Sequence, residues 1–198
     1  MKDIRLFLSI IACTLLCLTS CDESSEPGEY DNWQARNENY IDSIATLARN
    51  SQNGEWKVIL AEGLDSTKEW SNDFYVYCKV LGEGTGTAHP AFTDTVVVNY
   101  KGSLIPTGRH PEGYIFDSNY DGILDPAFDV PTKLPLSSTV AGFYTALQQM
   151  PADSRWIIYI PATLGYGASD ISGIPAYSTL IFDVNLVSFY PVGGSTLK

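Results

Sequence analysis

Thr95-Val96-Val97-Val98-Asn99-Tyr100 is a run of β-branched and aromatic residues that predicts a β-strand. Three further runs have strand length and similar composition, and Gly, Pro and Asp residues separate them: 74–81, 156–160 and 179–187. Within residues 139–150, Val140, Phe143, Tyr144 and Leu147 share one stripe, which predicts a short helix. One helix among several strands, without regular alternation of strand and helix, favours an α+β fold with an antiparallel sheet.

The segment before these strands predicts a second helix. Apolar residues recur at mostly helical spacing over 32–50, and Asp31 followed by Gln34 resembles a capping box. Asn53-Gly54 supplies a stop signal. We expect the apolar stripe of this helix to pack against the neighbouring domain, and residues 56–60 to add an edge strand that is followed by a loop.

The first 30 residues predict export and attachment to a membrane. Lys2 and Arg5 precede an uncharged apolar run over 6–18, which is typical of a secretory signal peptide and is short for a bilayer span. The run ends in Leu18-Thr19-Ser20-Cys21, which resembles the lipobox of bacterial lipoproteins. We therefore expect Cys21 to carry lipid and to anchor a chain that does not itself span the membrane. The expected organisation is a signal peptide at 1–20, an acidic tether at 21–30, a helical extension at 31–72, the main domain at 73–190 and a tail at 191–198.

A lipid anchor places the protein in a bacterial cell envelope, and two signals in the sequence indicate different membranes. The acidic run after Cys21 resembles a surface-export signal of some lipoproteins, whereas an Asp directly after the Cys, as Asp22 is, resembles inner-membrane retention in others. The outer membrane or the cell surface is favoured over the inner membrane.

Charge and cysteine content exclude two further classes. The chain has 23 acidic and 12 basic side chains and a formal net charge of −11, so it would repel a phosphate backbone, and nucleic acid is not an expected partner. Once the signal peptide is removed and Cys21 is lipidated, Cys78 is the remaining cysteine, so no internal disulfide is expected. Cys78 alternates with Val76 and Val80, which predicts a small core residue.

Metal, nucleotide and hydrolase sites have little support. His89 and His110 each stand beside a Pro, without cysteines or acidic residues at zinc-site spacing. Residues 117–122 match the first six positions of an EF-hand loop, but Phe128 stands where the closing carboxylate is required. Residues 82–86 lack the spacing of a dinucleotide-binding loop, and no Gly-x-Ser-x-Gly elbow is present. We expect neither a cofactor nor a metal.

Five blocks in order carry the strongest signal: residues 96–102, Phe116-Asp117-Ser118, Val140-Ala141-Gly142-Phe143, Leu164-Gly165-Tyr166-Gly167, and Ile174-Pro175 running into 179–184. Over residues 74–189 the chain resembles the FKBP-type peptidyl-prolyl cis-trans isomerases. The resemblance implies a twisted antiparallel sheet of five or six strands wrapped around one short helix, which agrees with the elements expected from the residues alone. It also implies catalysis of rotation about X-Pro bonds, here in exported proteins, without a cofactor.

The same resemblance assigns the site. Tyr166 resembles the hydroxyl donor to a substrate carbonyl, the backbone N–H of Val140 resembles a second donor, and Asp117 resembles the carboxylate at the pocket edge. Phe143 corresponds to the pocket floor, where the best-known members have Trp. The remaining residues are expected to complete the apolar walls: Tyr100, Phe116, Phe128, Ile174 and Phe182.

Departures from the family pattern keep a second hypothesis open. The loop 104–114 replaces a short Asp-Gly turn, and the basic residue that usually follows the Phe-Asp-Ser block is absent. A catalytically weak FKBP-like binding or chaperone module could hold a partner through the same groove or through the helix at 32–50, and that helix could also mediate dimerisation. The expected partners are proline-containing polypeptides and, by the resemblance, macrolides of the rapamycin type.

Overall fold

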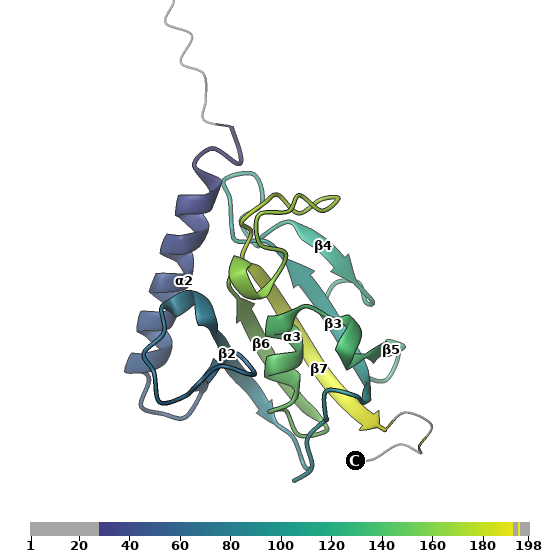
Figure 1. Cartoon of the computed structure of the whole chain (residues 1–198). Helices are drawn as coiled ribbons and strands as arrows, with labels where there is room; N and C mark the ends of the chain where they lie inside the picture. Colours follow the sequence, from purple (N-terminus) through teal and green to yellow (C-terminus); the bar gives the residue numbers. More distant parts are fainter. Residues whose placement is uncertain (1–27, 192–193, 195–198) are drawn as a thin grey trace, which may run out of the picture. The chain divides into compact units, whose positions relative to one another are not determined.

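The computed structural model describes residues 28–191 and 194 of the 198-residue chain (Figure 1). The predicted signal peptide, Cys21 and most of the tether lie outside the described residues. The chain divides into two compact units, Met1–Asp31 and Asn32–Lys198, and the second unit carries all the helices and strands that follow. These are α2 (Trp33–Asn50), β1 (Trp56–Leu60), η1 (Asn72–Phe74), β2 (Tyr75–Glu83), β3 (Thr95–Ser103), β4 (Ile115–Ser118), β5 (Thr132–Pro135), η2 (Leu136–Ser138), α3 (Ala141–Leu147), β6 (Ser154–Ile160), η3 (Ala162–Leu164) and β7 (Leu180–Tyr190).

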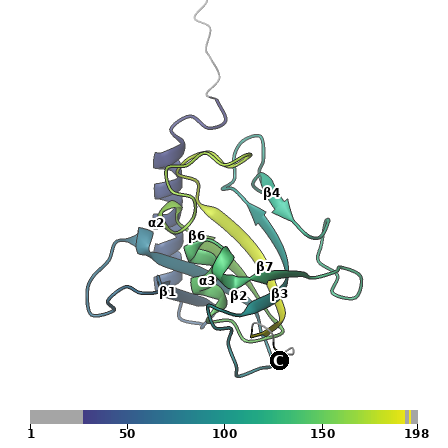
Figure 2. The ribbon, with the colours of Figure 1, turned by 45° about the vertical axis from the view of Figure 1, so that its right-hand side comes forward.

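The strands form one antiparallel sheet of seven strands, which confirms the predicted α+β class. The order is β1-β2-β6-β7-β3-β4, and β5 pairs with β3. The sheet curves around α3, as Figure 2 shows from the side. β1 is the expected edge strand, whereas α3 is shorter than the predicted helix over 139–150.

The main core lies between the sheet and α3. Along β6 and β7, buried and half-buried residues alternate, so that every second side chain points at the helix. Phe143 and Leu147 of α3 are buried in this core together with Trp156 and Ile158. A side chain at Gly142 would collide with Ile160, so the glycine allows α3 to approach β6 closely.

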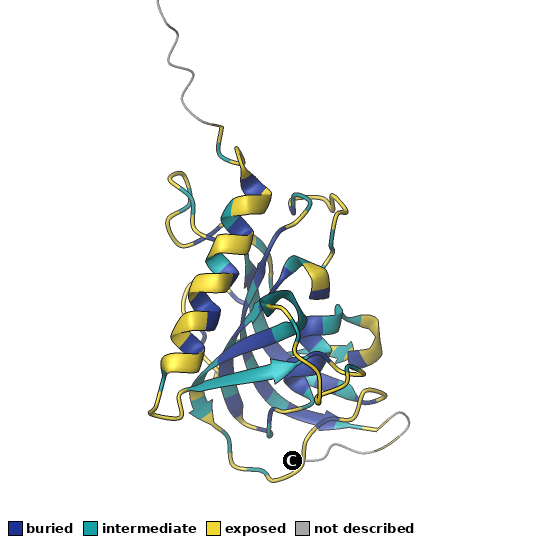
Figure 3. Cartoon of the chain, turned by 60° about the vertical axis from the view of Figure 1, so that its left-hand side comes forward, coloured by how far each residue is buried: buried dark blue, intermediate teal, exposed yellow. Residues whose placement is uncertain are grey.

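A second core lies on the opposite face of the sheet, beneath α2. Ile41, Ile44, Ala45 and Ala48 pack around Tyr77 of β2, and Figure 3 shows the buried side of α2 turned toward the sheet. This confirms the expected packing of the apolar stripe; Leu47, which the helical spacing also assigns to that stripe, is 54% exposed instead. Because both faces of β2 are covered, Tyr77 is buried as well as its neighbours Val76 and Cys78.

The capping box predicted at the start of α2 is wrong. The residue before the helix is Asn32, which has a left-handed conformation (φ 52°) and no side-chain capping hydrogen bond. The Asp31 carboxylate instead accepts a hydrogen bond from the N–H of Gly28 (2.8 Å), and the Gln34 amide donates to Glu38 (2.8 Å).

Cys78 is a fully buried free thiol in β2, as predicted. Burial raises the pKa of this thiol far above its usual range, which makes it unreactive in the folded state. Within the described residues, no helix has both the length and the apolar character that crossing a membrane would require.

Candidate active site

A cavity of about 290 Å³ opens where the ends of several elements meet. Strands β3, β4, β5 and β7 contribute to it, together with the segment before α3, α3 itself and the loop that follows η3. The residues that line it are Tyr100, Asp117, Leu134, Ser138, Thr139, Val140, Phe143, Tyr166 and Phe182.

Aromatic rings form the floor and one wall of this cavity. The ring of Phe182 lies edge-on to Phe143 (centroids 5.1 Å apart) and to Phe116 (5.5 Å), and tilted to Tyr100 (6.4 Å). Such edge-on packing orients each ring by its neighbours. Gly102 of β3 makes this cluster possible, because a Cβ atom there would stand 2.6 Å from the Phe116 ring and 2.8 Å from the Phe182 ring.

A tyrosine–carboxylate pair stands on the polar side. The Tyr100 hydroxyl donates to the Asp117 carboxylate at 2.7 Å. Burial, and then this hydrogen bond, raise the pKa of Tyr100 well above its usual value, so the phenol keeps its proton. Asp117 is exposed at the rim of the cavity, on β4.

Asn119 holds this pair in place and was not predicted from the sequence. Its side-chain oxygen accepts from the Tyr100 N–H (2.8 Å), and its amide nitrogen donates to the carbonyl of Val98 (3.0 Å) and to that of Val130 (3.3 Å). It therefore ties the end of β4 to β3 and to the segment before β5. The hint in the sequence is an Asn directly after the Phe-Asp-Ser block, but its partners are too distant in sequence to be inferred.

Two further lining residues, Tyr166 and Val140, carry hydrogen-bond donors. Tyr166 is 39% exposed and follows η3, where the N–H groups of Gly165 and Gly167 both donate to the carbonyl of Ala162 (3.0 and 2.9 Å). Val140 precedes the first turn of α3, and its backbone N–H has no hydrogen-bond partner among the described residues.

Six of the nine predicted pocket residues therefore line the cavity, whereas Phe116 and Ile174 lie outside its lining. Phe116 is half-buried behind Phe182, with which it makes the ring contact described above. Ile174 is 5% exposed and belongs to the main core, in a turn where it pairs with Ile171.

The position predicted for Phe128 is wrong. Its side chain is 84% exposed and does not line the cavity. A turn in which the N–H groups of Phe128 and Asp129 donate to the carbonyl of Asp125 carries the ring into solvent. The wall expected from Phe128 is provided by Leu134, because β5 pairs with β3 in a register that places Leu134 opposite Val96.

The long loop 104–114 contributes no residue to the lining of the cavity. Its base is closed by a hydrogen bond from the Leu104 N–H to the Tyr114 carbonyl (2.9 Å), and its tip by one from Thr107 to the carbonyl of His110 (2.9 Å). Leu104 and Ile105 are buried, so the loop begins as part of the core.

Comparison with known proteins gives a consistent result. The family model for FKBP-type peptidyl-prolyl cis-trans isomerases matches residues 86–187. The chain is 38% identical over 111 residues to the outer membrane protein MIP of Legionella longbeachae, covering 56% of this chain and 42% of that protein. It is 35% identical over 127 residues to the FKBP-type 22 kDa peptidyl-prolyl cis-trans isomerase of Escherichia coli (strain K12), covering 64% and 53%.

Solved structures show the same fold. The crystal structure of FkpA from Escherichia coli superposes with a TM-score of 0.58 at 26% identity, over 96% of this chain and 73% of that one. A peptidyl-prolyl cis-trans isomerase from Pseudomonas syringae pv. tomato gives a TM-score of 0.55 at 24% identity, over 79% and 95%. The chain spans about half the length of the curated relatives it matches. With the family model matching more than half of its residues, the chain belongs to the FKBP-type peptidyl-prolyl cis-trans isomerase family.

Proposed function

We propose that the cavity catalyses cis–trans rotation about X-Pro peptide bonds. This rotation has a barrier of about 18–20 kcal/mol and breaks no covalent bond, so the site needs neither a nucleophile nor a metal. The observation that carries the proposal is a cavity floored by Phe143 and Phe182, with hydrogen-bond donors and one carboxylate at its edge.

The apolar floor favours the transition state over the ground state. Twisting the X-Pro bond removes amide resonance, so the twisted amide is less charge-separated than the planar one. Rings that exclude water therefore stabilise it relative to the substrate, which is the differential binding that catalysis requires. Phe143 is 3% exposed and Phe182 8%, so both rings are held by the core and can seat a prolyl ring without rearranging.

The polar groups would hold the peptide on either side of the proline. The Tyr166 hydroxyl and the Val140 N–H donate to substrate carbonyl groups, while the rings seat the proline itself. Asp117 would act at the edge, oriented by the hydroxyl of Tyr100. Macrolides of the rapamycin type would compete for the same cavity.

Attachment to the envelope forms the second part of the proposal. Lipid on Cys21 would hold the mature chain at a membrane surface, where X-Pro isomerisation limits the folding of exported proteins. The lipobox-like residues 18–21 support this, as does similarity to a protein named as an outer membrane protein. The outer membrane or the cell surface is the favoured location.

Exchange spectroscopy on short X-Pro peptides tests the proposed catalysis without a coupled protease. Residues 22–198, which lack the lipidated Cys21, should accelerate cis–trans exchange, and Tyr166→Phe should reduce kcat/KM by about 2- to 10-fold, as expected for the loss of one neutral hydrogen bond. Asp117→Ala should also reduce it. Tyr177→Phe is the matched control, because Tyr177 is 40% exposed in the same loop but does not line the cavity.

A folded sample that leaves the exchange rate at its uncatalysed value would refute the proposed catalysis. That outcome would support the binding-module hypothesis, in which the same groove holds a proline-containing partner without turnover.

A further inference from the structure

We propose that the first two turns of α2 position the loop that carries Tyr166, with Trp33 and Asn37 as positioning residues for the isomerase site. The inference rests on the proposed function, since it concerns the geometry of the same cavity. It assigns a role in the reaction to a helix that lies on the opposite face of the sheet from α3.

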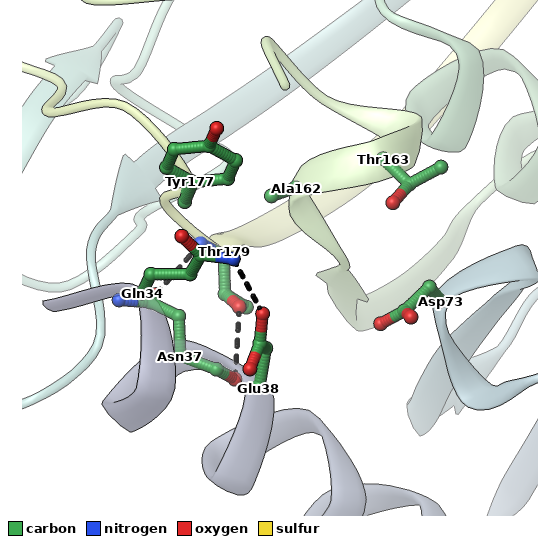
Figure 4. Close-up of a pocket in the computed structure, with 8 residues that line it drawn as sticks. All are labelled: Gln34, Asn37, Glu38, Asp73, Ala162, Thr163, Tyr177 and Thr179. Atoms are coloured by element: carbon green, nitrogen blue, oxygen red, sulfur yellow. Dashed lines mark hydrogen bonds between the residues drawn. The ribbon is translucent and has the colours of Figure 1, made fainter. Parts of the chain in front are cut away.

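Buried hydrogen bonds connect α2 to the end of this loop. The side-chain oxygen of Asn37 accepts from the Thr179 N–H at 2.7 Å, and the indole N–H of Trp33 donates to the Ser178 hydroxyl oxygen at 2.8 Å (Figure 4 shows the first of these). The Asn37 amide also donates to the carbonyl of Trp33 at 2.7 Å, which fixes its orientation. All four residues are between 1% and 6% exposed.

Only a short path separates these bonds from the cavity. Ser178 and Thr179 directly follow Tyr177, whose N–H donates to the carbonyl of Gly167 at 2.7 Å. Gly167 is the residue after Tyr166. A shift of Ser178 or Thr179 would therefore move Tyr177, and the hydrogen bond from Tyr177 to Gly167 would move the backbone next to Tyr166.

On one side of this buried contact the loop borders open space rather than packed atoms. A cavity of about 150 Å³ lies beside the contact, and Glu38, Thr163 and Tyr177 are among the residues that line it (Figure 4). Because the segment around Tyr177 lacks packed neighbours on that side, the bonds from α2 add to the hydrogen bonds within the loop, such as that from Ala176 to Asp170, in holding it. Since an error of about 1 Å in a positioned group can cost roughly 100-fold in rate, the bonds from α2 matter for catalysis.

The test compares the two ends of α2 in the mature chain. Asn37→Ala removes the acceptor for the Thr179 N–H, and Ser178→Ala removes the acceptor for the Trp33 indole from the loop side. Arg49→Ala is the matched control, because Arg49 hydrogen-bonds Asn72 (2.6 Å) and Tyr77 at the other end of the helix, and none of its hydrogen bonds within the described residues reaches residues 177–179.

We expect Asn37→Ala and Ser178→Ala to lower kcat/KM on X-Pro peptides by about 3- to 10-fold, each corresponding to one hydrogen bond. The loss should fall mainly on kcat, because the aromatic floor that binds the proline is untouched. Arg49→Ala should retain wild-type activity. Amide NMR signals of residues 165–179 should shift in the first two variants and stay in place in Arg49→Ala.

Wild-type kcat/KM together with unshifted amide signals in folded Asn37→Ala and Ser178→Ala would overturn the inference. Equal losses in Arg49→Ala would also overturn it, because they would point to a general loss of stability. If the wild type itself showed no catalysis, the proposed function would fail, and the amide signals alone would still show whether α2 positions the loop.

Discussion

Gly102→Ala tests whether the aromatic cluster is built as tightly as the structure indicates. The new methyl group would stand 2.6 and 2.7 Å from ring atoms of Phe116 and 2.8 Å from one of Phe182. Ordinary carbon contacts are about 3.5–4.0 Å, so both rings must move by roughly 1 Å. Overpacking of this kind costs about 1–3 kcal/mol, which corresponds to a fall in Tm of roughly 2–12 °C for a chain of this size.

The same shift should damage the site, because Phe182 contacts Phe143 on the floor of the cavity. We expect kcat/KM to fall by up to about 100-fold. Calorimetry gives the Tm, and exchange spectroscopy on an X-Pro peptide gives the rate. Gly108→Ala is the control, since no atom lies within 4 Å of a Cβ placed there, and it should behave as the wild type.

A second substitution distinguishes ring displacement from other effects of the methyl group. Phe116→Leu removes the ring atoms that the methyl meets, so the double variant should be more stable than Gly102→Ala alone. A single Gly102→Ala variant with wild-type Tm and wild-type kcat/KM would refute the packing argument.

Three other predictions follow from particular side chains. Leu134→Ala should lower kcat/KM measured by peptide exchange because it opens a wall of the cavity, whereas Phe128→Ala should leave it unchanged; a reversed result would restore Phe128 to the site. Burial, followed by the charges of Asp42 and Glu38, raises the pKa of Asp73, so its carboxylate costs stability as the pH rises through the carboxyl range. Asp73→Asn should therefore raise the Tm at about pH 7 and lose that advantage below about pH 3, and an equal Tm difference at both pH values would contradict this. In a variant whose only cysteine is Cys78, a thiol reagent should react after denaturation but not in the folded state, and fast reaction of the folded protein would show that the thiol is accessible.

Long β-branched runs made much of the fold predictable. β2, β3, β6 and β7 all coincide with runs recognised from composition, and the helix stripe over 32–50 was correctly expected to pack on the domain. β4 and β5 have four residues each, too few for alternation to be distinctive, and pairing with β3 defines them. The start of α2 was misjudged because the acidic residue expected to cap it forms a local turn instead.

The candidate site was predictable where it depends on ordered motifs, and unpredictable where it depends on register. Tyr100, Asp117 and Tyr166 stand in short blocks whose spacing is distinctive, and the structure brings all three to one cavity. Phe128 was placed there incorrectly, because residue spacing does not show which path the loop between β4 and β5 follows. Asn119 and Asn37 were missed because their partners lie elsewhere in the chain.

The proposed mechanism requires that the X-Pro bond rotates while the prolyl ring lies against Phe143 and Phe182 on the floor of this cavity. A direct measurement combines exchange spectroscopy with intermolecular NOEs in one sample of residues 22–198 and a short X-Pro peptide. The account predicts faster cis–trans exchange together with NOEs from the prolyl ring protons to Phe143 and Phe182. Exchange at the uncatalysed rate, or acceleration with NOEs to a different surface, would contradict it.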